Sequence, residues 1–235
     1  MENEQKVMRI LSDEPAVQPC VLALGMFDGV HLGHRELIRR GREMADSQGS
    51  ALCVCTFSIH PREIFDPGHA PKHLTTVAER ASLMAKAGVN MMRVLPFNRR
   101  VASIPPEDFL KMLTERFRPS GVICGDDYTF GRYGSGDTGM LKAWAARVGI
   151  PADVVDEVRV NGQRVSSTLI REELARGDVR RAEVLMGHGY TLSGVVESGK
   201  RMGRELGFQP RTFRFRPGNS CRHTGYIPVW LIGWA

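Results

Sequence analysis

The sequence predicts an α/β protein built on a doubly wound parallel sheet. Five apolar runs of strand length alternate with segments whose apolar residues recur at helical spacing. Such alternation is typical of a parallel sheet with helices on both faces, joined by right-handed crossovers. The chain has 235 residues, 42% of them hydrophobic and 25% charged, which suits one full globular domain and part of another.

The first strand and the first helix flank a glycine-rich turn. Residues 20–24, Cys-Val-Leu-Ala-Leu, are continuously apolar, as in a strand that is buried on both faces. The turn occupies residues 25–34. After it, apolar residues recur between charged ones, which predicts an amphipathic helix; they are Leu37, Ile38, Met44 and Ala45.

The second strand is expected at residues 51–57, and a helix should begin soon after it. Thr76 stands three residues before Glu79, which is a capping-box signal, and Gly88 favours the end of that helix. The later elements follow the same rules. They are strands 91–97, 121–124 and 152–158, a helix 105–117, a helix carrying Leu141, Trp144 and Val148, and two short helices near 168–176 and 178–186.

The cysteines and the N-terminus predict a cytoplasmic protein. Residues 1–17 are polar and acidic, and no run approaches the eighteen or so apolar residues of a membrane span. None of the five cysteines belongs to a Cys-x-x-Cys pair. Four of them lie in apolar runs and are expected to be buried reduced thiols: Cys20, Cys53, Cys55 and Cys124.

The net charge of +6 lies in one segment. Residues 200–222 contain seven Lys and Arg against Glu205 alone, so the rest of the chain is balanced. Basic pairs elsewhere are typical of solvated helix faces. Nucleic acid is therefore not expected as a partner.

The turn at residues 25–34 has the features of a phosphate-binding loop. Gly25, Gly29 and Gly33 allow tight bends and a close approach to a ligand, and the N–H groups at the start of the next helix favour an anion. His31 and His34 add donors. The alternative for each histidine is ordinary turn chemistry with a satisfied imidazole.

Three further loops should meet this turn. In doubly wound sheets, ligands bind outside the carboxyl ends of the strands. The loops after the first, second, fourth and fifth predicted strands all lie at that edge. They bring one group of side chains to a single crevice: His31, His34, His60, Asp126, Asp127, Ser166, Ser167, Thr168 and Arg171.

These groups favour direct nucleotidyl transfer. The sequence offers no arrangement for a nucleophilic triad, no Walker-type loop and no metal-ligand cluster. Transfer of AMP from ATP to a phosphate depends mainly on alignment and on stabilisation of charge. His31 and His34 would hold the triphosphate, Ser167 and Thr168 would donate to phosphate oxygens, and Arg171 would brace the departing pyrophosphate.

Four segments resemble the adenylyltransferase module of the bacterial bifunctional riboflavin kinase/FAD synthetase family. Residues 25–34 are similar to Gly-x-Phe-Asp-Gly-x-His-x-Gly-His, and residues 56–61 to Thr-Phe-x-x-His-Pro. Residues 125–131 resemble Gly-x-Asn/Asp-Phe-x-Phe-Gly, with Tyr128 in place of the first phenylalanine, and residues 165–171 resemble Ile-Ser-Ser-Thr-x-Ile-Arg. The resemblance implies a Rossmann-like sheet of the nucleotidyltransferase type. It also implies an ATP:FMN adenylyltransferase that makes FAD, with Mg²⁺ carried by ATP and no metal ligand from the protein.

The resemblance also implies roles for the matching residues. His31, His34 and Arg171 would be catalytic, while Gly25, Phe27, Gly33, Ser167 and Thr168 would bind ATP. Flavin contacts would come from Phe57, His60, Pro61, Asp127, Tyr128 and Phe130. For each aromatic residue the alternative is core packing, and for His60-Pro61 it is a rigid turn.

The family continues into a small β-barrel riboflavin kinase, and here the sequence departs from the pattern. Residues 194–199 and 203–208 resemble its start, but Gln209-Pro210-Arg211-Thr212 replaces Pro-Thr-Ala-Asn, and Pro228 falls where a strand is needed. We expect an adenylyltransferase domain at 1–186 and an incomplete β-barrel remnant at 187–235. Kinase activity should be absent, and residues 200–235 should be poorly ordered or docked on the first domain.

Two other functions remain open at this point. The acceptor of AMP is pantetheine phosphate or nicotinate mononucleotide in other nucleotidyltransferases of this type. Alternatively, the chain is a degenerate, non-catalytic paralogue that binds flavin or RNA through its basic tail. The expected partners are ATP and FMN, with no membrane, and weak self-association is left open.

Overall fold

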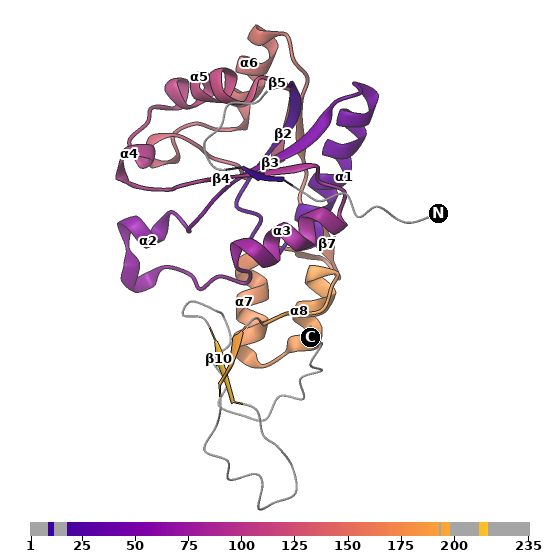
Figure 1. The fold of residues 1–235 in the computed structure, drawn as a ribbon, viewed down its shortest axis with the longest axis vertical. Coiled ribbons are helices and arrows are strands. Elements are labelled where there is room, and N and C mark those ends of the chain that lie inside the picture. Colours follow the sequence, from indigo (N-terminus) through magenta and orange to yellow (C-terminus); the bar gives the residue numbers. More distant parts are fainter. Residues whose placement is uncertain (1–8, 12–17, 193, 198–211, 216–235) are drawn as a thin grey trace, which may run out of the picture.

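The computed structural model describes residues 9–11, 18–192, 194–197 and 212–215, and its centre is a parallel sheet (Figure 1). Six strands pair in the order β1-β4-β3-β2-β5-β6, and every pair is parallel. The strands are β1 (Arg9–Leu11), β2 (Cys20–Leu24), β3 (Ala51–Phe57), β4 (Met91–Leu95), β5 (Pro119–Gly125) and β6 (Ala152–Val155). The doubly wound parallel sheet is thereby confirmed.

Strand order reverses between β2 and β5, because the chain builds β3 and β4 on one side of β2 and then returns to place β5 on the other. Such a switch point leaves a crevice at the carboxyl ends of the two strands. The loops that follow β2 and β5 flank this crevice.

Helices cover both faces of the sheet. One face packs against α1 (Leu32–Ser47) and α3 (Val77–Lys86), and the other against α5 (Pro106–Phe117) and α6 (Thr138–Val148). Alternate strand residues supply the two cores: Leu22 and Leu24 face α5 and α6, whereas Val21 and Ala23 face α1. The continuous apolar run of β2 reflects this burial on both sides.

A third core joins the last two helices to the chain before them. It contains Leu74, Ile170 and Leu185, among others, and it brings together α7 (Ser167–Arg176) and α8 (Val179–Met186), which lie side by side below the sheet in Figure 1. The smaller elements complete the described chain. They are α2 (Arg62–Phe65), η1 (Pro67–His69), α4 (Arg99–Ala102), η2 (Arg132–Gly134), β7 (Arg159–Val160), β8 (Gln163–Arg164), β9 (Gly194–Glu197) and β10 (Thr212–Phe215).

Most predicted elements are confirmed, including the Thr76 capping box, whose two hydrogen bonds to Glu79 are both formed. Three details differ. β4 and β6 end at Leu95 and Val155, earlier than expected, and β1 forms in a segment that was expected to be only polar. Val148 is 42% exposed, because the buried stripe of α6 consists of Leu141, Trp144 and Ala145.

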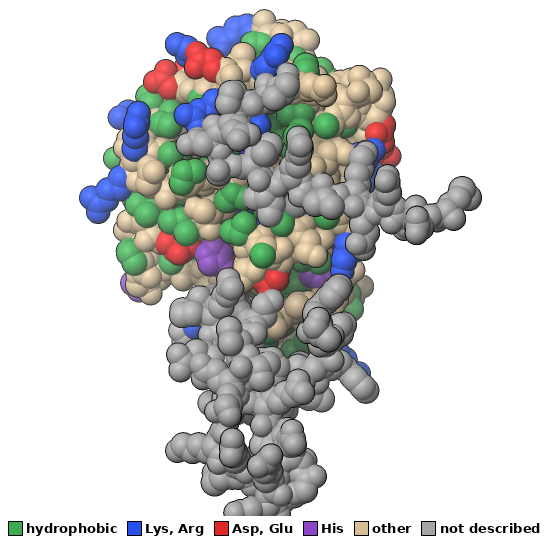
Figure 2. Space-filling view, in the orientation of Figure 1, with side chains coloured by type: hydrophobic (Ala, Val, Ile, Leu, Met, Phe, Trp, Pro, Cys, Tyr) green, Lys and Arg blue, Asp and Glu red, His purple; other side chains and the backbone are tan. Residues whose placement is uncertain are grey.

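The four cysteines expected to be buried thiols are buried and free. Burial raises the pKa of Cys55 and of Cys124 to about 12, so both remain protonated at neutral pH. None of the helices that the structure describes has the length and apolar character needed to span a membrane. On the face drawn in Figure 2, hydrophobic side chains lie between scattered charged ones.

The predicted division into residues 1–186 and 187–235 stays a prediction. Within the second part, β9 and β10 pair antiparallel, with Gly194 opposite Phe215. The expectations for residues 209–211 and 225–228, and for most of 200–235, fall outside the described residues.

Candidate active site

Four loops meet around one cavity of about 330 Å³ at the carboxyl edge of the sheet. They are the loops after β2, β3, β5 and β6, which were expected to converge there. Every side chain assigned to the crevice lines this cavity: His31, His34, His60, Asp126, Asp127, Ser166, Ser167, Thr168 and Arg171. Their gathering is confirmed, whereas their individual roles remain predictions.

His31 begins helix α1 as its N-cap residue. Its Nδ1 accepts a hydrogen bond from the backbone N–H of His34 at 3.4 Å. A neutral imidazole that accepts at Nδ1 carries its hydrogen on Nε2. Burial lowers the pKa of His31 to about 4, and Arg171 and Arg164 add to this effect while Asp28 opposes it. His31 is thus a neutral donor at pH 7.

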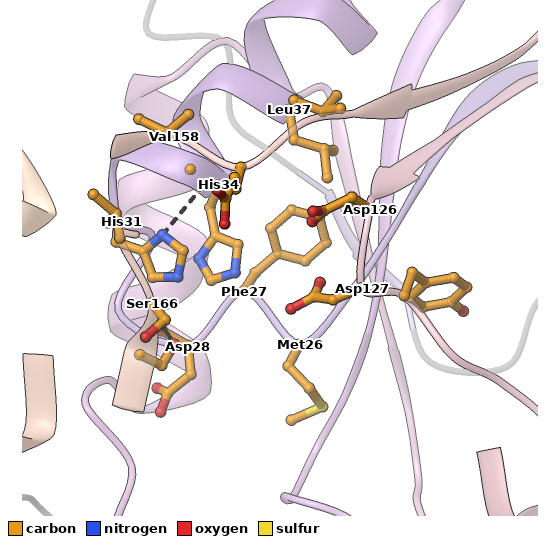
Figure 3. A pocket seen from close by; sticks show the side chains of 18 of the residues that line it. Met26, Phe27, Asp28, His31, His34, Leu37, Asp126, Asp127, Val158 and Ser166 are labelled. Carbon is orange, nitrogen blue, oxygen red and sulfur yellow. Dashed lines mark hydrogen bonds between the residues drawn. The ribbon is translucent and has the colours of Figure 1, made fainter. Parts of the chain in front are cut away.

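His34 lies directly against His31. The two rings are stacked with their centroids 3.6 Å apart, and Figure 3 shows them side by side in the cavity. Burial, together with the neighbouring His31 and Arg80, holds the pKa of His34 well below its ordinary value. Its Nδ1 is buried without a hydrogen-bond partner among the described residues.

Two glycines make room for these rings. A Cβ atom on Gly33 would lie 3.3 Å from the His31 ring, and one on Gly25 would lie 3.1 Å from the ring of Phe27. Phe27 itself is fully buried and packs against His34, with 5.1 Å between the ring centroids. Phe27 therefore supports His34 and also lines the cavity, and its contact with ATP stays a prediction.

Asp28 joins three segments of the site, a role that the sequence analysis did not assign to it. Its carboxylate accepts from the backbone N–H of Leu74 (3.0 Å) and of Thr75 (3.0 Å) and from Arg171 Nη2 (2.6 Å). Burial by itself would raise the pKa of Asp28, but these N–H groups and the guanidinium groups of Arg80 and Arg171 lower it. Asp28 is therefore a buried anion at pH 7.

Arg80 is a second residue that was missed. It is 1% exposed, and its Nη1 donates to the carbonyl of Met26 (3.0 Å) and to Thr56 Oγ1 (3.1 Å). It thereby ties the loop after β2 to the end of β3. Helical spacing places Arg80 on the buried face of α3, three residues after Val77 and four before Met84, and this was the signal that could have found it.

Arg171 presents one edge of its guanidinium to the protein. Nε donates to the carbonyl of Lys72 at 2.6 Å and Nη2 to Asp28 at 2.6 Å. Nη1 has no hydrogen-bond acceptor among the residues that the structure describes. The side chain lines the cavity, so this second edge remains for a ligand.

The start of α7 is fastened to the loop after β2. Ser166 is the N-cap residue, and its Oγ accepts from the N–H of Leu169. Ser167 Oγ donates to the carbonyl of Asp28 at 2.9 Å. Ser167 and Thr168 both line the cavity, and their donation to phosphate oxygens stays a prediction.

The residues expected to contact flavin divide between two cavities. Phe57, Pro61, Tyr128 and Phe130 line a second cavity of about 390 Å³, whereas His60 and Asp127 line the first. Tyr128 and Thr129 line both, which places the cavities next to each other. Other aromatic residues of the second cavity were not anticipated: Phe65, Phe97, Phe109 and Tyr133.

Phe130 belongs to the core as well as to the second cavity. It is 5% exposed and stacks between Phe109 and Tyr128, at 5.5 and 5.9 Å between ring centroids. Burial raises the pKa of Tyr128 well above its ordinary value, so its hydroxyl stays protonated. Phe130 can therefore form a rigid wall of the second cavity, and Tyr128 lies between the two cavities.

His60 and Asp127 line the first cavity, and each has a partner in the protein. His60 Nδ1 accepts from the N–H of Arg62 at 3.2 Å, which again leaves the hydrogen on Nε2. Asp127, like Asp126, forms an ion pair with Arg164 at 2.8 Å. Arg164 was missed, although it directly precedes the segment 165–171.

Comparison with known proteins gives consistent matches. The family model described as FAD synthetase matches residues 13–169. Proteins named bifunctional riboflavin kinase/FMN adenylyltransferase are 35% identical to the chain in Haemophilus influenzae and 34% identical in Escherichia coli K12, over 84% of this chain in both cases. The Bacillus subtilis protein of that name is 34% identical over 80% of this chain.

The matches cover 65%, 63% and 60% of these three relatives, so the chain spans less than two thirds of their length. A solved structure of a protein named as a macrolide-efflux protein, from Streptococcus pneumoniae, superposes with a TM-score of 0.81 at 26% identity. That match covers 90% of this chain and 71% of the other, and it supports the fold.

Proposed function

The chain belongs to the FAD synthetase family, and on that basis we propose that it is an ATP:FMN adenylyltransferase. A phosphate oxygen of FMN attacks the α-phosphorus of ATP. The new oxygen–phosphorus bond forms as the bond from the α-phosphorus to the bridging oxygen of the β-phosphate breaks. The products are FAD and pyrophosphate.

The adjoining cavities carry this proposal. One is lined by histidines, hydroxyls and Arg171, and the other mainly by aromatic and apolar side chains. FMN has a planar ring system at one end and a phosphate at the other. With the ring in the aromatic cavity, its phosphate points past Tyr128 toward the first cavity, where the triphosphate of ATP would lie.

The first helix N-terminus supplies neutral donors to the triphosphate. At the start of α1, the N–H of His34 is capped by His31, whereas the N–H groups of Leu32 and Gly33 have no hydrogen-bond partner among the described residues and favour an anion. Next to them, the Nε2–H of His31 donates without carrying a charge. Stabilisation by oriented dipoles requires no proton transfer, which suits a reaction whose difficulty is charge and alignment.

The second helix N-terminus and Arg171 act on the departing pyrophosphate. Thr168 offers a hydroxyl at the start of α7. Arg171, whose Nε and Nη2 are held by Lys72 and Asp28, offers its remaining edge. Because the guanidinium is held before substrate arrives, little entropy is lost when it meets the developing charge.

Mg²⁺ would enter with ATP. No group of three or more His, Cys, Asp or Glu side chains among the described residues is arranged to hold a metal ion, and Asp126 and Asp127 are paired with Arg164. Phosphate oxygens and water would therefore supply most of its ligands. When bound, the ion neutralises charge on the triphosphate.

The proposal includes the absence of riboflavin kinase activity. The reason lies in the sequence, where Gln209-Pro210-Arg211-Thr212 replaces the Pro-Thr-Ala-Asn that helps to bind the magnesium nucleotide in the family. FMN would then come from a separate kinase reaction.

A chromatographic assay with ATP and Mg²⁺ tests both statements. FMN should give FAD and pyrophosphate, and riboflavin should give no product. Parallel tubes with pantetheine phosphate and nicotinate mononucleotide examine the other acceptors, and a preference for either would replace FMN in the proposal. FMN or FAD formed from riboflavin would refute the absence of kinase activity.

A pair of variants on one helix links the activity to the site. Arg171→Ala should lower turnover by about a hundredfold or more, as expected when a group that stabilises transition-state charge is removed. Arg176→Ala is the control, because Arg176 lies on the same helix with its side chain 64% exposed and, among the described residues, forms an ion pair only with Glu173. Equal activity of the two variants would exclude the role given to Arg171.

A further inference from the structure

The carbonyl oxygens of the loop after β2 accept hydrogen bonds from other parts of the protein. A loop that binds phosphate has to present N–H groups, so its carbonyls need other partners. In this structure four successive carbonyls have them. Met26 accepts from Thr56 and Arg80, Phe27 from the N–H of Val30, Asp28 from Ser167, and Gly29 from His188.

His188 is the unexpected member of this set. It follows α8, 159 residues from Gly29 in sequence, and lies beyond the segment 13–169 that the family model matches. Its Nε2 is 2.9 Å from the carbonyl oxygen of Gly29. Since a carbonyl only accepts, the hydrogen of this bond belongs to His188. Its Nδ1 also lies 2.9 Å from a carbonyl, that of Gly189. A ring with a single N–H donates to one of these two carbonyls, so the bond to Gly29 requires the tautomer that carries its hydrogen on Nε2.

A second contact holds the same segment against α1. Arg35, in the first turn of α1, donates from Nη1 to the carbonyl of Gly187 at 2.7 Å. Gly187 has φ +71°, and a Cβ atom there would lie 2.6 Å from Leu32 Cδ2, so the backbone passes very close to the start of that helix. The segment is thereby fixed where His188 can reach Gly29.

We propose that His188 is a positioning residue for adenylyl transfer, which holds the Gly29 carbonyl and through it the orientation of the loop that carries His31. The inference rests on the proposed function for its effect on turnover. It also implies that the working adenylyltransferase unit extends past residue 186, because His188 and its anchor at Gly187 lie beyond the predicted boundary.

The hydrogen bond from His188 restrains Gly29, a residue whose backbone can change conformation easily. Its φ of +80° lies in the left-handed region, and glycine moves between positive and negative φ at little cost. Its N–H is held by Thr75 Oγ1 at 3.0 Å, and its carbonyl by His188. Without the second bond, the peptide between residues 29 and 30 is held only by the 3.2 Å hydrogen bond from the N–H of Val30 to the carbonyl of Phe27, and His31 follows two residues later.

Two variants of the full chain separate the effect of losing this hydrogen bond from the effect of losing the imidazole ring. In His188→Gln the side-chain amide nitrogen lies about where Nε2 lies in histidine, so a donor to Gly29 is retained. In His188→Asn the amide nitrogen corresponds to Nδ1 and falls short of Gly29. We expect His188→Gln to stay within about twofold of wild type in kcat/KM for ATP, and His188→Asn to lose about tenfold, the equivalent of one hydrogen bond.

Amide hydrogen exchange of residues 25–34 supplies a readout that does not depend on activity. Exchange in this loop should be faster in His188→Asn than in His188→Gln, while both variants keep a similar Tm. Val184→Ala is the control for unrelated effects of changing this region, because Val184 lies on α8 and is 52% exposed.

The outcomes are distinguishable. Asn and Gln variants with equal kcat/KM and equal loop exchange would overturn the proposal, whether both resemble wild type or both are impaired. If the wild-type chain makes no FAD, the proposed function fails, and the exchange comparison alone then decides whether His188 holds the loop.

Discussion

Arg171 and Asp28 form an ion pair of 2.6 Å between residues that are 143 positions apart in the sequence. The Asp28 side chain is 3% exposed and that of Arg171 is 18% exposed. The carboxylate also receives the N–H groups of Leu74 and Thr75. One buried anion thus fixes the guanidinium and the segment before α3 to the loop after β2.

Asp28→Asn should be strongly destabilising. The amide removes the charge that Arg171 and Arg80 face, and breaking a buried pair by neutralising one partner costs about 3–5 kcal/mol. Chemical denaturation measures this loss. Asp153→Asn is the matched control, because Asp153 pairs with Arg40 at 2.6 Å in a more exposed place and should lose about 1 kcal/mol or less. Similar losses in the two variants would contradict the role of Asp28.

His31→Asn should separate helix capping from catalysis. Asparagine is a good N-cap residue and its oxygen replaces Nδ1 as acceptor, so the free energy of unfolding should change by less than about 1 kcal/mol. The Nε2–H donor is lost, and turnover should fall by about a hundredfold. FAD formation and denaturation measured on the same preparation test this. An active variant would show that the imidazole serves only as a cap.

Stability should fall as the pH drops from about 6.5 toward 4. His31, His34 and His60 have lowered pKa values in the folded chain, mainly through burial, so the unfolded chain binds more protons in this range. The contribution of each neutral histidine is complete above its ordinary pKa of about 6.5 and is lost below it at up to about 1.4 kcal/mol per pH unit.

Comparison with His31→Asn isolates one histidine. Denaturation at pH 7, 6 and 5 should give a shallower slope for the variant than for wild type. Asp28 does not interfere, because its pKa is lowered from 3.8, so the stability it contributes is lost only below that pH. Parallel slopes for the two proteins would mean that His31 is not held neutral.

Substitutions in the two cavities should affect different substrates. Phe65→Ala removes an aromatic wall of the second cavity and should raise KM for FMN by about tenfold, the cost of one to two kcal/mol of apolar contact. Because Phe65 is 58% exposed, its loss should change stability little.

Thr168→Val is the converse test, because it removes only a hydroxyl from the first cavity. It should raise KM for ATP by several-fold and leave KM for FMN unchanged. Steady-state kinetics with each substrate varied in turn compares the two variants. If each variant affected both substrates alike, the assignment of the cavities would be wrong.

Gly29→Ala should cost more than Gly49→Ala. Both glycines have positive φ, +80° and +60°, so both variants carry backbone strain of about 1 kcal/mol. Only at position 29 does the new Cβ meet a neighbour, with Leu74 Cδ1 at 2.7 Å. Denaturation should show about 1–3 kcal/mol of further loss there, the range for overpacking. If both variants lost the same free energy of unfolding, the loop would be able to shift away from Leu74 at no energetic cost.

The sequence by itself determined five of the six strands of the sheet, the crossover helices and the edge at which the four loops meet. These features follow from local information: apolar periodicity fixes the elements, and right-handed crossovers bring the carboxyl ends of parallel strands to one edge. His31, His34, Thr168 and Arg171 therefore line the expected cavity.

Only the tertiary structure decided which hydrogen-bond partners hold the loops of the site in place. Asp28 meets Leu74, Ser167 turns its hydroxyl to Asp28, and His188 reaches Gly29, across 46, 139 and 159 residues. The division of the flavin residues between two cavities was decided in the same way. Such pairings depend on how packed elements align, since a buried polar group takes whichever partner packing brings within about 3 Å, and no periodicity in the chain records that choice.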